Sequence, residues 1–166
     1  MRLALPSLRR TLPVLGALLT LTACLGTDAT SVPNIPSNPA VETYAAVTGV
    51  VIANMTKLND NLFIQELTVG TGKAAAAGDT VSVYYTGWIP KGTVFDSNIG
   101  KTVIKFPLGT GYVIPGWDLG LVGLKVGGKR KIVIGSTLAY ANQSPDPSRI
   151  PQNSTLVFDV ELTAAK

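Results

Sequence analysis

Few side chains in this 166-residue chain are of the types that perform covalent or metal chemistry. The sequence contains no histidine and one cysteine, Cys24. Without histidine there is no Ser/His or Cys/His nucleophile pair, and without a second cysteine there is neither a disulfide nor a thiolate zinc site. The ten acidic residues are scattered without calcium-loop spacing. We therefore expect no metal site and no cofactor.

One acid lies beside an aromatic residue, in the segment VYYTGWIPKGTVFDSN at residues 83–98. Two tyrosines lie near the end of an apolar strand, a turn follows at residues 90–92, and Phe95 then precedes Asp96. On this segment alone, Asp96 is explained as a turn acid. The alternative is a polar group placed against an apolar wall, which requires partners from elsewhere in the chain.

The segments around this acid alternate as strands of an antiparallel sheet do. Val81, Val83 and Tyr85 occupy one face of the strand expected at residues 79–88. The expected strands are residues 61–72, 79–88, 102–109, 129–135 and 155–163. In the last of these, the inward residues are Leu156, Phe158, Val160 and Leu162. Asp159 and Glu161 point the other way, so a solvent-facing side of the strand explains them better than a paired-carboxylate site.

A different periodicity appears in IPGWDLGLVGLKVGG, residues 114–128. Trp117, Leu121 and Leu124 recur at helical spacing, and Pro115 stands near a plausible helix start. Each internal glycine costs a helix about 1 kcal/mol relative to alanine, so the helix should be short. A small sheet that wraps one short helix is an α+β arrangement.

The same region contains a segment similar to a phosphate-binding loop, GLKVGGKR at residues 123–130. Arg130 stands where the Mg-binding serine or threonine belongs, and a helix precedes the segment where a strand should. We therefore do not expect this chain to bind a nucleotide.

The N-terminus has the pattern of an export signal. Three arginines lie within the first ten residues, residues 11–20 are mostly apolar, and LTAC follows at residues 21–24. LTAC resembles the lipobox of bacterial lipoproteins, which implies a signal peptide at residues 1–23 and lipidation at Cys24. The alternative is a plain secretory signal. We predict a protein that is exported and anchored by lipid to a bacterial membrane, facing the periplasm or the cell exterior.

The remaining chain divides into three parts. Residues 24–43 are rich in Pro, Ser, Thr and Asn and are expected to form a flexible tether after the lipidated cysteine. Residues 44–60 have no clear pattern and form an N-terminal extension, and residues 61–166 form the folded domain. From residue 24 onward there are 11 basic and 10 acidic residues. This balance leaves no basic patch for nucleic acid.

The order of motifs resembles the FKBP-type peptidyl-prolyl isomerase domain, over residues 61–166. The matching motifs are VYYTGW, FDSN, KFPLGTGYVIPGWDLGL, KVGGKRKIVI, LAY and IPQNSTLVFDVEL. The resemblance implies a highly twisted antiparallel sheet of five or six strands around one short helix, in agreement with the α+β interpretation above.

The resemblance also implies an apolar pocket for a prolyl segment. The residues expected to act on the substrate are Phe95, Asp96, Ile114, Trp117 and Tyr140. Those expected to bind it are Tyr85, Ile104, Val113, Ile150 and Phe158. Trp117 would form the floor and Phe95 a wall. Asp96 would be the polar group beside that wall, and Ile150 would overhang the mouth.

The implied function is cis–trans isomerisation of X–Pro bonds in exported or surface proteins, without a covalent intermediate. The alternative is a proline-peptide binding module or holdase that uses the same pocket without useful turnover. The expected partners are proline-containing polypeptides, macrolide inhibitors of the FKBP family, and the membrane through Cys24. We expect a monomer.

Three positions depart from the family pattern. Ile104 and Leu138 stand where many members have aromatic residues, and Arg149 occupies a position that is often aliphatic. These departures predict an active enzyme with an altered preference for the residue before proline.

Overall fold

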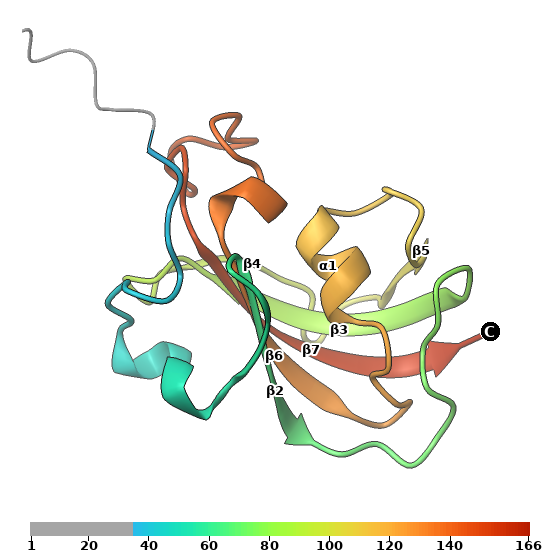
Figure 1. The fold of residues 1–166 in the computed structure, drawn as a ribbon. Helices are drawn as coiled ribbons and strands as arrows, with labels where there is room; N and C mark the ends of the chain where they lie inside the picture. Colours follow the sequence, from blue (N-terminus) through green and yellow to red (C-terminus); the bar gives the residue numbers. More distant parts are fainter. Residues whose placement is uncertain (1–34) are drawn as a thin grey trace, which may run out of the picture. The chain divides into compact units, whose positions relative to one another are not determined.

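All five predicted strands form, and they make up most of one antiparallel sheet (Figure 1). The computed structural model describes residues 35–166. The strands are β1 (Thr56–Asn59), β2 (Leu62–Thr68), β3 (Thr80–Trp88), β4 (Val94–Ser97), β5 (Ile104–Pro107), β6 (Lys129–Ile134) and β7 (Leu156–Ala165). The helices are α1 (Pro115–Gly120) and three 3-10 turns, η1 (Ala46–Thr48), η2 (Ile52–Asn54) and η3 (Ser136–Leu138).

The sheet order is β1-β2-β6-β7-β3-β4, and β5 pairs with β3 beside β4. The α+β class, an antiparallel sheet around one short helix, is confirmed. The sheet has seven strands instead of five or six. The additional strands are short: β4 contains Phe95 and Asp96, and β1 lies in the segment that we treated as an extension.

Helix α1 packs very closely on one face of the sheet (Figure 1). A Cβ added to Gly116 would lie 2.3 Å from Cγ2 of Ile134, and one added to Gly120 would lie 3.0 Å from Cγ2 of Ile132. These two glycines therefore let the helix backbone approach β6. The inward residues predicted for β7, from Leu156 to Leu162, lie in this core.

The helix is shorter than predicted. The helical spacing of apolar residues extends to Leu124, but α1 ends at Gly120. The guanidinium of Arg130 donates hydrogen bonds from Nη1 to the carbonyls of Gly120 (2.7 Å) and Val122 (2.9 Å). These bonds satisfy carbonyls that a longer helix would have paired. Leu121 and Leu124 remain buried, in the turn that follows.

The opposite face of the sheet is covered by residues 44–55. Phe63, Val133 and Val157 form a second buried cluster. The residues that pack against it are Tyr44, Val50, Ile52, Met55 and Trp88. The segment described from sequence as an extension is therefore packed on the domain, and its last strand, β1, joins the sheet through β2.

Charged residues also lie on this second face. The Lys131 ammonium forms an ion pair with Asp159 and lies 5.5 Å from the ring centroid of Trp88. Asp159 thus pairs with a buried lysine instead of facing solvent alone.

The last residues of the expected tether also contact the domain. Pro39 is buried, and the Tyr44 hydroxyl donates a hydrogen bond to its carbonyl (2.8 Å). Residues 35–43 thus include fixed contacts where the composition predicted a flexible spacer. The predicted signal peptide at residues 1–23, the predicted lipidation site Cys24 and the first part of the expected tether, residues 25–34, lie outside the described residues. Among residues 35–166, no helix is long and apolar enough to cross a membrane.

Candidate functional site

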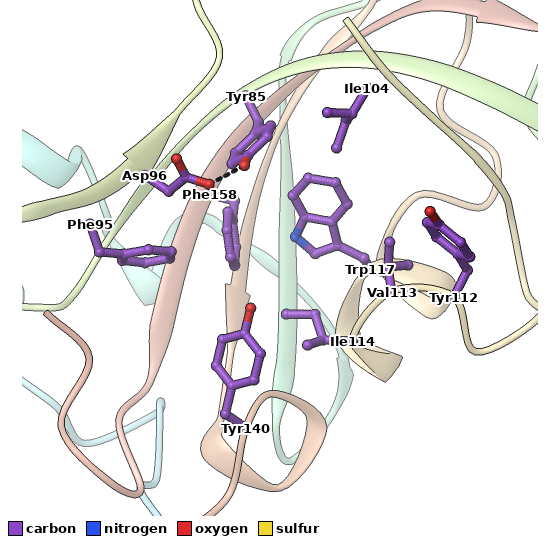
Figure 2. Close-up of a pocket in the computed structure, with 10 residues that line it drawn as sticks. All are labelled: Tyr85, Phe95, Asp96, Ile104, Tyr112, Val113, Ile114, Trp117, Tyr140 and Phe158. Atoms are coloured by element: carbon purple, nitrogen blue, oxygen red, sulfur yellow. Dashed lines mark hydrogen bonds between the residues drawn. The ribbon is translucent and has the colours of Figure 1, made fainter. Parts of the chain in front are cut away.

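A cavity of about 430 Å³ opens beside α1, on the face of the sheet that carries the main core (Figure 2). Strands β3, β4, β5 and β7, the start of α1 and the segment after η3 all contribute side chains to it. The lining residues are Tyr85, Phe95, Asp96, Ile104, Tyr112, Val113, Ile114, Trp117, Tyr140 and Phe158. The lining is therefore mainly aromatic and aliphatic, and Asp96 is the one acidic side chain in it.

Trp117 lies at the centre of the aromatic lining (Figure 2). Its ring centroid is 5.1 Å from that of Tyr85 and 5.2 Å from that of Phe158, and both pairs are nearly perpendicular. Phe95 packs edge-on against Phe158 with centroids 5.5 Å apart. Edge-to-face contacts of this kind favour the observed relative orientation of the rings. Trp117 is only 4% exposed and therefore belongs to both the cavity and the core.

Local backbone features place these rings. Pro115 occupies the first helical position and Ile114 precedes it in an extended conformation, which brings Ile114 and Trp117 to one side of the turn. A Cβ on Gly87 would lie 2.6 Å from Cζ of Phe95 and 2.9 Å from Cε1 of Phe158. Only glycine therefore lets these two rings close over β3.

Asp96 is held by hydrogen bonds on both of its carboxylate oxygens. Oδ2 accepts a hydrogen bond from the Tyr85 hydroxyl, and Oδ1 accepts one from the Ser97 backbone N–H (2.8 Å) (Figure 2). Burial raises the pKa of Tyr85, and the hydrogen bond to Asp96 raises it further. The phenol therefore remains a neutral donor at physiological pH, and Asp96 presents an oriented carboxylate at the edge of the apolar wall.

The end of β4, which carries Asp96, is fixed by a residue outside the predicted site, Asn98. Asn98 is 7% exposed and accepts a hydrogen bond from the Tyr85 backbone N–H (2.7 Å). Its side-chain amide donates to the carbonyl of Val83 (3.1 Å). The FDSN motif therefore contains a buried amide, just after β4, that ties the end of this strand to β3. The turn chemistry of the motif alone did not reveal this contact.

Tyr140 projects into the cavity from the segment after η3, opposite Tyr85 (Figure 2). Burial is the main cause that raises the pKa of Tyr140, and the negative charge of Asp96 adds to it. Its hydroxyl is thus a neutral donor or acceptor near the apolar floor.

The arrangement suits binding without covalent chemistry. Within residues 35–166, no cluster of three or more His, Cys, Asp or Glu residues could hold a metal ion. The lining contains no thiol, hydroxymethyl or amine nucleophile. What it offers a ligand is apolar area, the three phenols of Tyr85, Tyr112 and Tyr140, and one carboxylate.

Comparison with known proteins identifies the family. The model of the FKBP-type peptidyl-prolyl cis-trans isomerase family matches residues 71–163, more than half of the chain. The chain belongs to the FKBP family. Its match confirms the resemblance drawn from the sequence motifs of the folded domain.

FKBP relatives occur in bacteria and eukaryotes. The FK506-binding protein of Neisseria meningitidis is 44% identical over 103 residues, which are 61% of this chain and 94% of that protein. FK506-binding protein 4 of Rhizopus delemar is 44% identical over 112 residues, 68% of this chain and 29% of that protein. The chain therefore spans less than a third of this and other long relatives that it matches.

Solved structures of FKBP-type proteins share the fold. FkpA from Escherichia coli is 41% identical and superposes with a TM-score of 0.61, over 68% of this chain and 52% of that one. A peptidyl-prolyl isomerase from Pseudomonas syringae is 34% identical with a TM-score of 0.60, over 68% of this chain and 81% of that one.

Nine of the ten residues predicted for the FKBP pocket line the cavity. Ile150 does not: it is 5% exposed and packs in the main core, because the loop that carries it folds inward. The Ser144 hydroxyl donates a hydrogen bond to the Ile150 carbonyl, within this loop. Tyr112 lines the cavity although the sequence analysis omitted it, and it is 71% exposed. Tyr112 directly precedes Val113 and Ile114 in the sequence, and this position could have predicted its place in the lining.

Proposed function

We propose that this chain is a peptidyl-prolyl cis-trans isomerase that acts on X–Pro bonds of exported or surface proteins. The observation that carries the proposal is the aromatic cavity, with Asp96 and the phenols of Tyr85 and Tyr140 among its lining groups, in a chain of the FKBP family. A prolyl ring is apolar and compact, and it suits a floor made by Trp117.

The chemistry requires no proton transfer. Resonance gives the peptide C–N bond double-bond character, so rotation has a barrier of about 18–20 kcal/mol, and the twisted imide has lost this resonance. Water solvates the planar amide better than the twisted one. An apolar cavity that removes water and packs the prolyl ring therefore favours the twisted state over the planar state.

Polar groups at the cavity edge can hold the substrate while the imide turns. We assign the Tyr140 hydroxyl and the Ile114 backbone N–H as donors to carbonyls that flank the rotating bond. Asp96 has a positioning role, since it orients the Tyr85 phenol. It also places negative charge beside the Phe95 wall.

A protease-coupled assay with a proline-containing peptide tests this function in the full chain. We expect acceleration of cis-to-trans conversion that is proportional to protein concentration. Tight binding of the same peptide without acceleration would contradict the enzyme proposal and favour the alternative, a proline-peptide binding module or holdase.

We further propose that the cavity accepts macrolide inhibitors, because the names of several relatives describe them as FK506-binding proteins. The cavity is formed by residues of one chain, which supports action as a monomer. FK506 should inhibit the peptide assay at concentrations close to that of the protein. Full activity with excess FK506 would contradict this proposal.

We also propose that the protein is exported and anchored to a bacterial membrane through Cys24. The support is the LTAC sequence after a basic and then apolar N-terminus. Cells grown with a clickable fatty acid should label the wild-type protein but not Cys24→Ser. Equal labelling and membrane retention of the serine variant would contradict lipidation at this residue.

A further inference from the structure

A buried serine, Ser136, is one of the residues that hold the backbone around Tyr140. The Ser136 carbonyl accepts hydrogen bonds from the backbone N–H groups of Ala139 (3.0 Å) and Ala141 (2.8 Å), the two neighbours of Tyr140. Ala141 has a φ of 49°, in the left-handed region that alanine rarely adopts. Such a conformation persists only where surrounding contacts determine it. The position of the Tyr140 ring therefore depends on where Ser136 lies.

Ser136 is in turn held by the N-terminal segment. The Ser37 backbone N–H donates to Oγ of Ser136 (3.0 Å), and the Ser136 backbone N–H donates to Oγ of Ser37 (2.9 Å). Ser136 is 1% exposed. A Cβ added to the adjacent Gly135 would lie 3.0 Å from Cγ of Pro39. The segment at residues 37–39 thus packs against the η3 turn, 99 residues away in sequence (Figure 1).

We propose that Ser37 is a positioning residue for Tyr140. The reciprocal bonds between Ser37 and Ser136 hold the turn, and the turn sets where the Tyr140 hydroxyl stands in the cavity. The N-terminal segment, which precedes the region matched by the FKBP family, is then part of the catalytic machinery. This inference rests on the proposed function, in which that hydroxyl contacts the substrate.

A double-mutant cycle tests the proposal in the full chain. Ser37→Ala removes the acceptor for the Ser136 N–H, and we expect kcat/KM on the proline peptide to fall about threefold to fivefold, as for loss of one neutral hydrogen bond. In a Tyr140→Phe background, Ser37→Ala should change kcat/KM by less than about twofold. The reason is that Ser37 acts on the reaction by placing the Tyr140 hydroxyl, which this background lacks. Ser37→Thr, which keeps the hydroxyl, should restore activity.

Ser154→Ala is the matched control. The Ser154 hydroxyl donates to the carbonyl of Pro151 (2.8 Å) at an exposed site, so its removal should leave kcat/KM unchanged. An equal loss from Ser37→Ala in both backgrounds, or no loss in either, would overturn the positioning role.

A spectroscopic measurement separates failure of this inference from failure of the proposed function. In an NMR sample with labelled tyrosine rings, the signal of Tyr140 is identified as the one that Tyr140→Phe removes. Its chemical shift reports the surroundings of the Tyr140 ring. We expect Ser37→Ala to shift this signal and to leave that of Tyr84 in place. If the protein shows no isomerase activity, the shift still tests positioning, and an unchanged Tyr140 signal would overturn it.

Discussion

Of the three phenols that line the cavity, those of Tyr85 and Tyr140 differ in what they bind. The Tyr85 hydroxyl is committed to Asp96, whereas the Tyr140 hydroxyl points into the space above the floor (Figure 2). Both come from segments that buried polar residues hold by hydrogen bonds to the backbone. Asn98 binds the Tyr85 backbone N–H in β3, and Ser136 binds the turn around Tyr140. At this scale the site is an apolar cage in which the half-buried phenol of Tyr140 is free for a ligand, while Tyr112 is largely exposed.

Removal of the free phenol tests its share in catalysis. Tyr140→Phe keeps the ring and the packing, so we expect a folded protein with kcat/KM reduced about threefold to tenfold, the range of a neutral hydrogen bond. Tyr84→Phe on the same strand as Tyr85 is the control, because Tyr84 does not line the cavity. Wild-type activity of Tyr140→Phe in the protease-coupled assay would assign catalysis to the apolar cage alone.

The phenols also set the dependence of stability on pH. Folding raises the pKa values of Tyr85 and Tyr140, mainly by burial. At alkaline pH the folded state therefore retains protons that the unfolded state has lost. Their contribution to stability is complete below the unfolded tyrosine value of about 10 and is lost as pH rises above it.

We therefore expect the urea midpoint to fall as pH rises from about 10 to 11. Isomerase activity should stay nearly constant between about pH 6 and pH 9, because the chain contains no histidine to titrate. A titration of kcat/KM with a midpoint near pH 6.5 or 7 would contradict the mechanism. For stability, the double variant Tyr85→Phe and Tyr140→Phe should show a smaller fall of the urea midpoint at alkaline pH.

At the scale of elements, α1 is held by the sheet and not by its own length. A six-residue helix with two glycines is not stable alone. It persists because Gly116 and Gly120 allow close packing on β6, and because Arg130 of β6 binds the carbonyls that end it. The helix and the floor residue Trp117 are thus positioned by a strand that contributes nothing to the cavity lining.

Arg130→Met should show how much this strand contributes. The substitution keeps the apolar stem but leaves the carbonyls of Gly120 and Val122 without their donor, so we expect the free energy of unfolding to fall by about 2–4 kcal/mol. Glu66, which pairs with the same guanidinium, is 39% exposed at its side chain, so Glu66→Gln should cost about 1 kcal/mol or less. Urea denaturation measures both, and equal effects would contradict a special role for the helix carbonyls.

At the scale of the whole domain, the sheet is covered on both faces. Helix α1 and the cavity occupy one face, and residues 44–55 close the other over Phe63, Val133 and Val157. These three residues would otherwise expose apolar area to water. The N-terminal extension therefore stabilises the fold, and it continues into the segment that contacts the Tyr140 turn.

Paired substitutions in the extension test this cover. Ile52 packs on the second cluster and Val51, its neighbour, is 53% exposed. We expect Ile52→Ala to lower the free energy of unfolding by about 1–2 kcal/mol, less than in a full core because the site is half-buried. Val51→Ala should cost less than about 0.5 kcal/mol. Indistinguishable urea midpoints for the two variants would show that the extension does not protect the sheet.

The sequence by itself determined five of the seven strands, the start of the helix and most of the cavity. Alternation in residues such as Val81 and Val83 predicted strands, since every second side chain of a strand faces one side of the sheet. The helical spacing that begins at Trp117 predicted where α1 starts. The resemblance of the motifs predicted nine of the ten residues that line the cavity, all except Tyr112. These features are local, or they rest on motifs short enough to be recognised along the chain.

Only the tertiary structure decided how distant segments meet. The helix ends early because Arg130 reaches it from β6, and Ile150 lies in the core because its loop folds inward. The bond between Ser37 and Ser136 joins residues 99 positions apart, and a polar, proline-rich segment carries no periodicity that would indicate it. Contacts of this kind depend on the packed positions of several elements at once, so composition and spacing along the chain do not determine them.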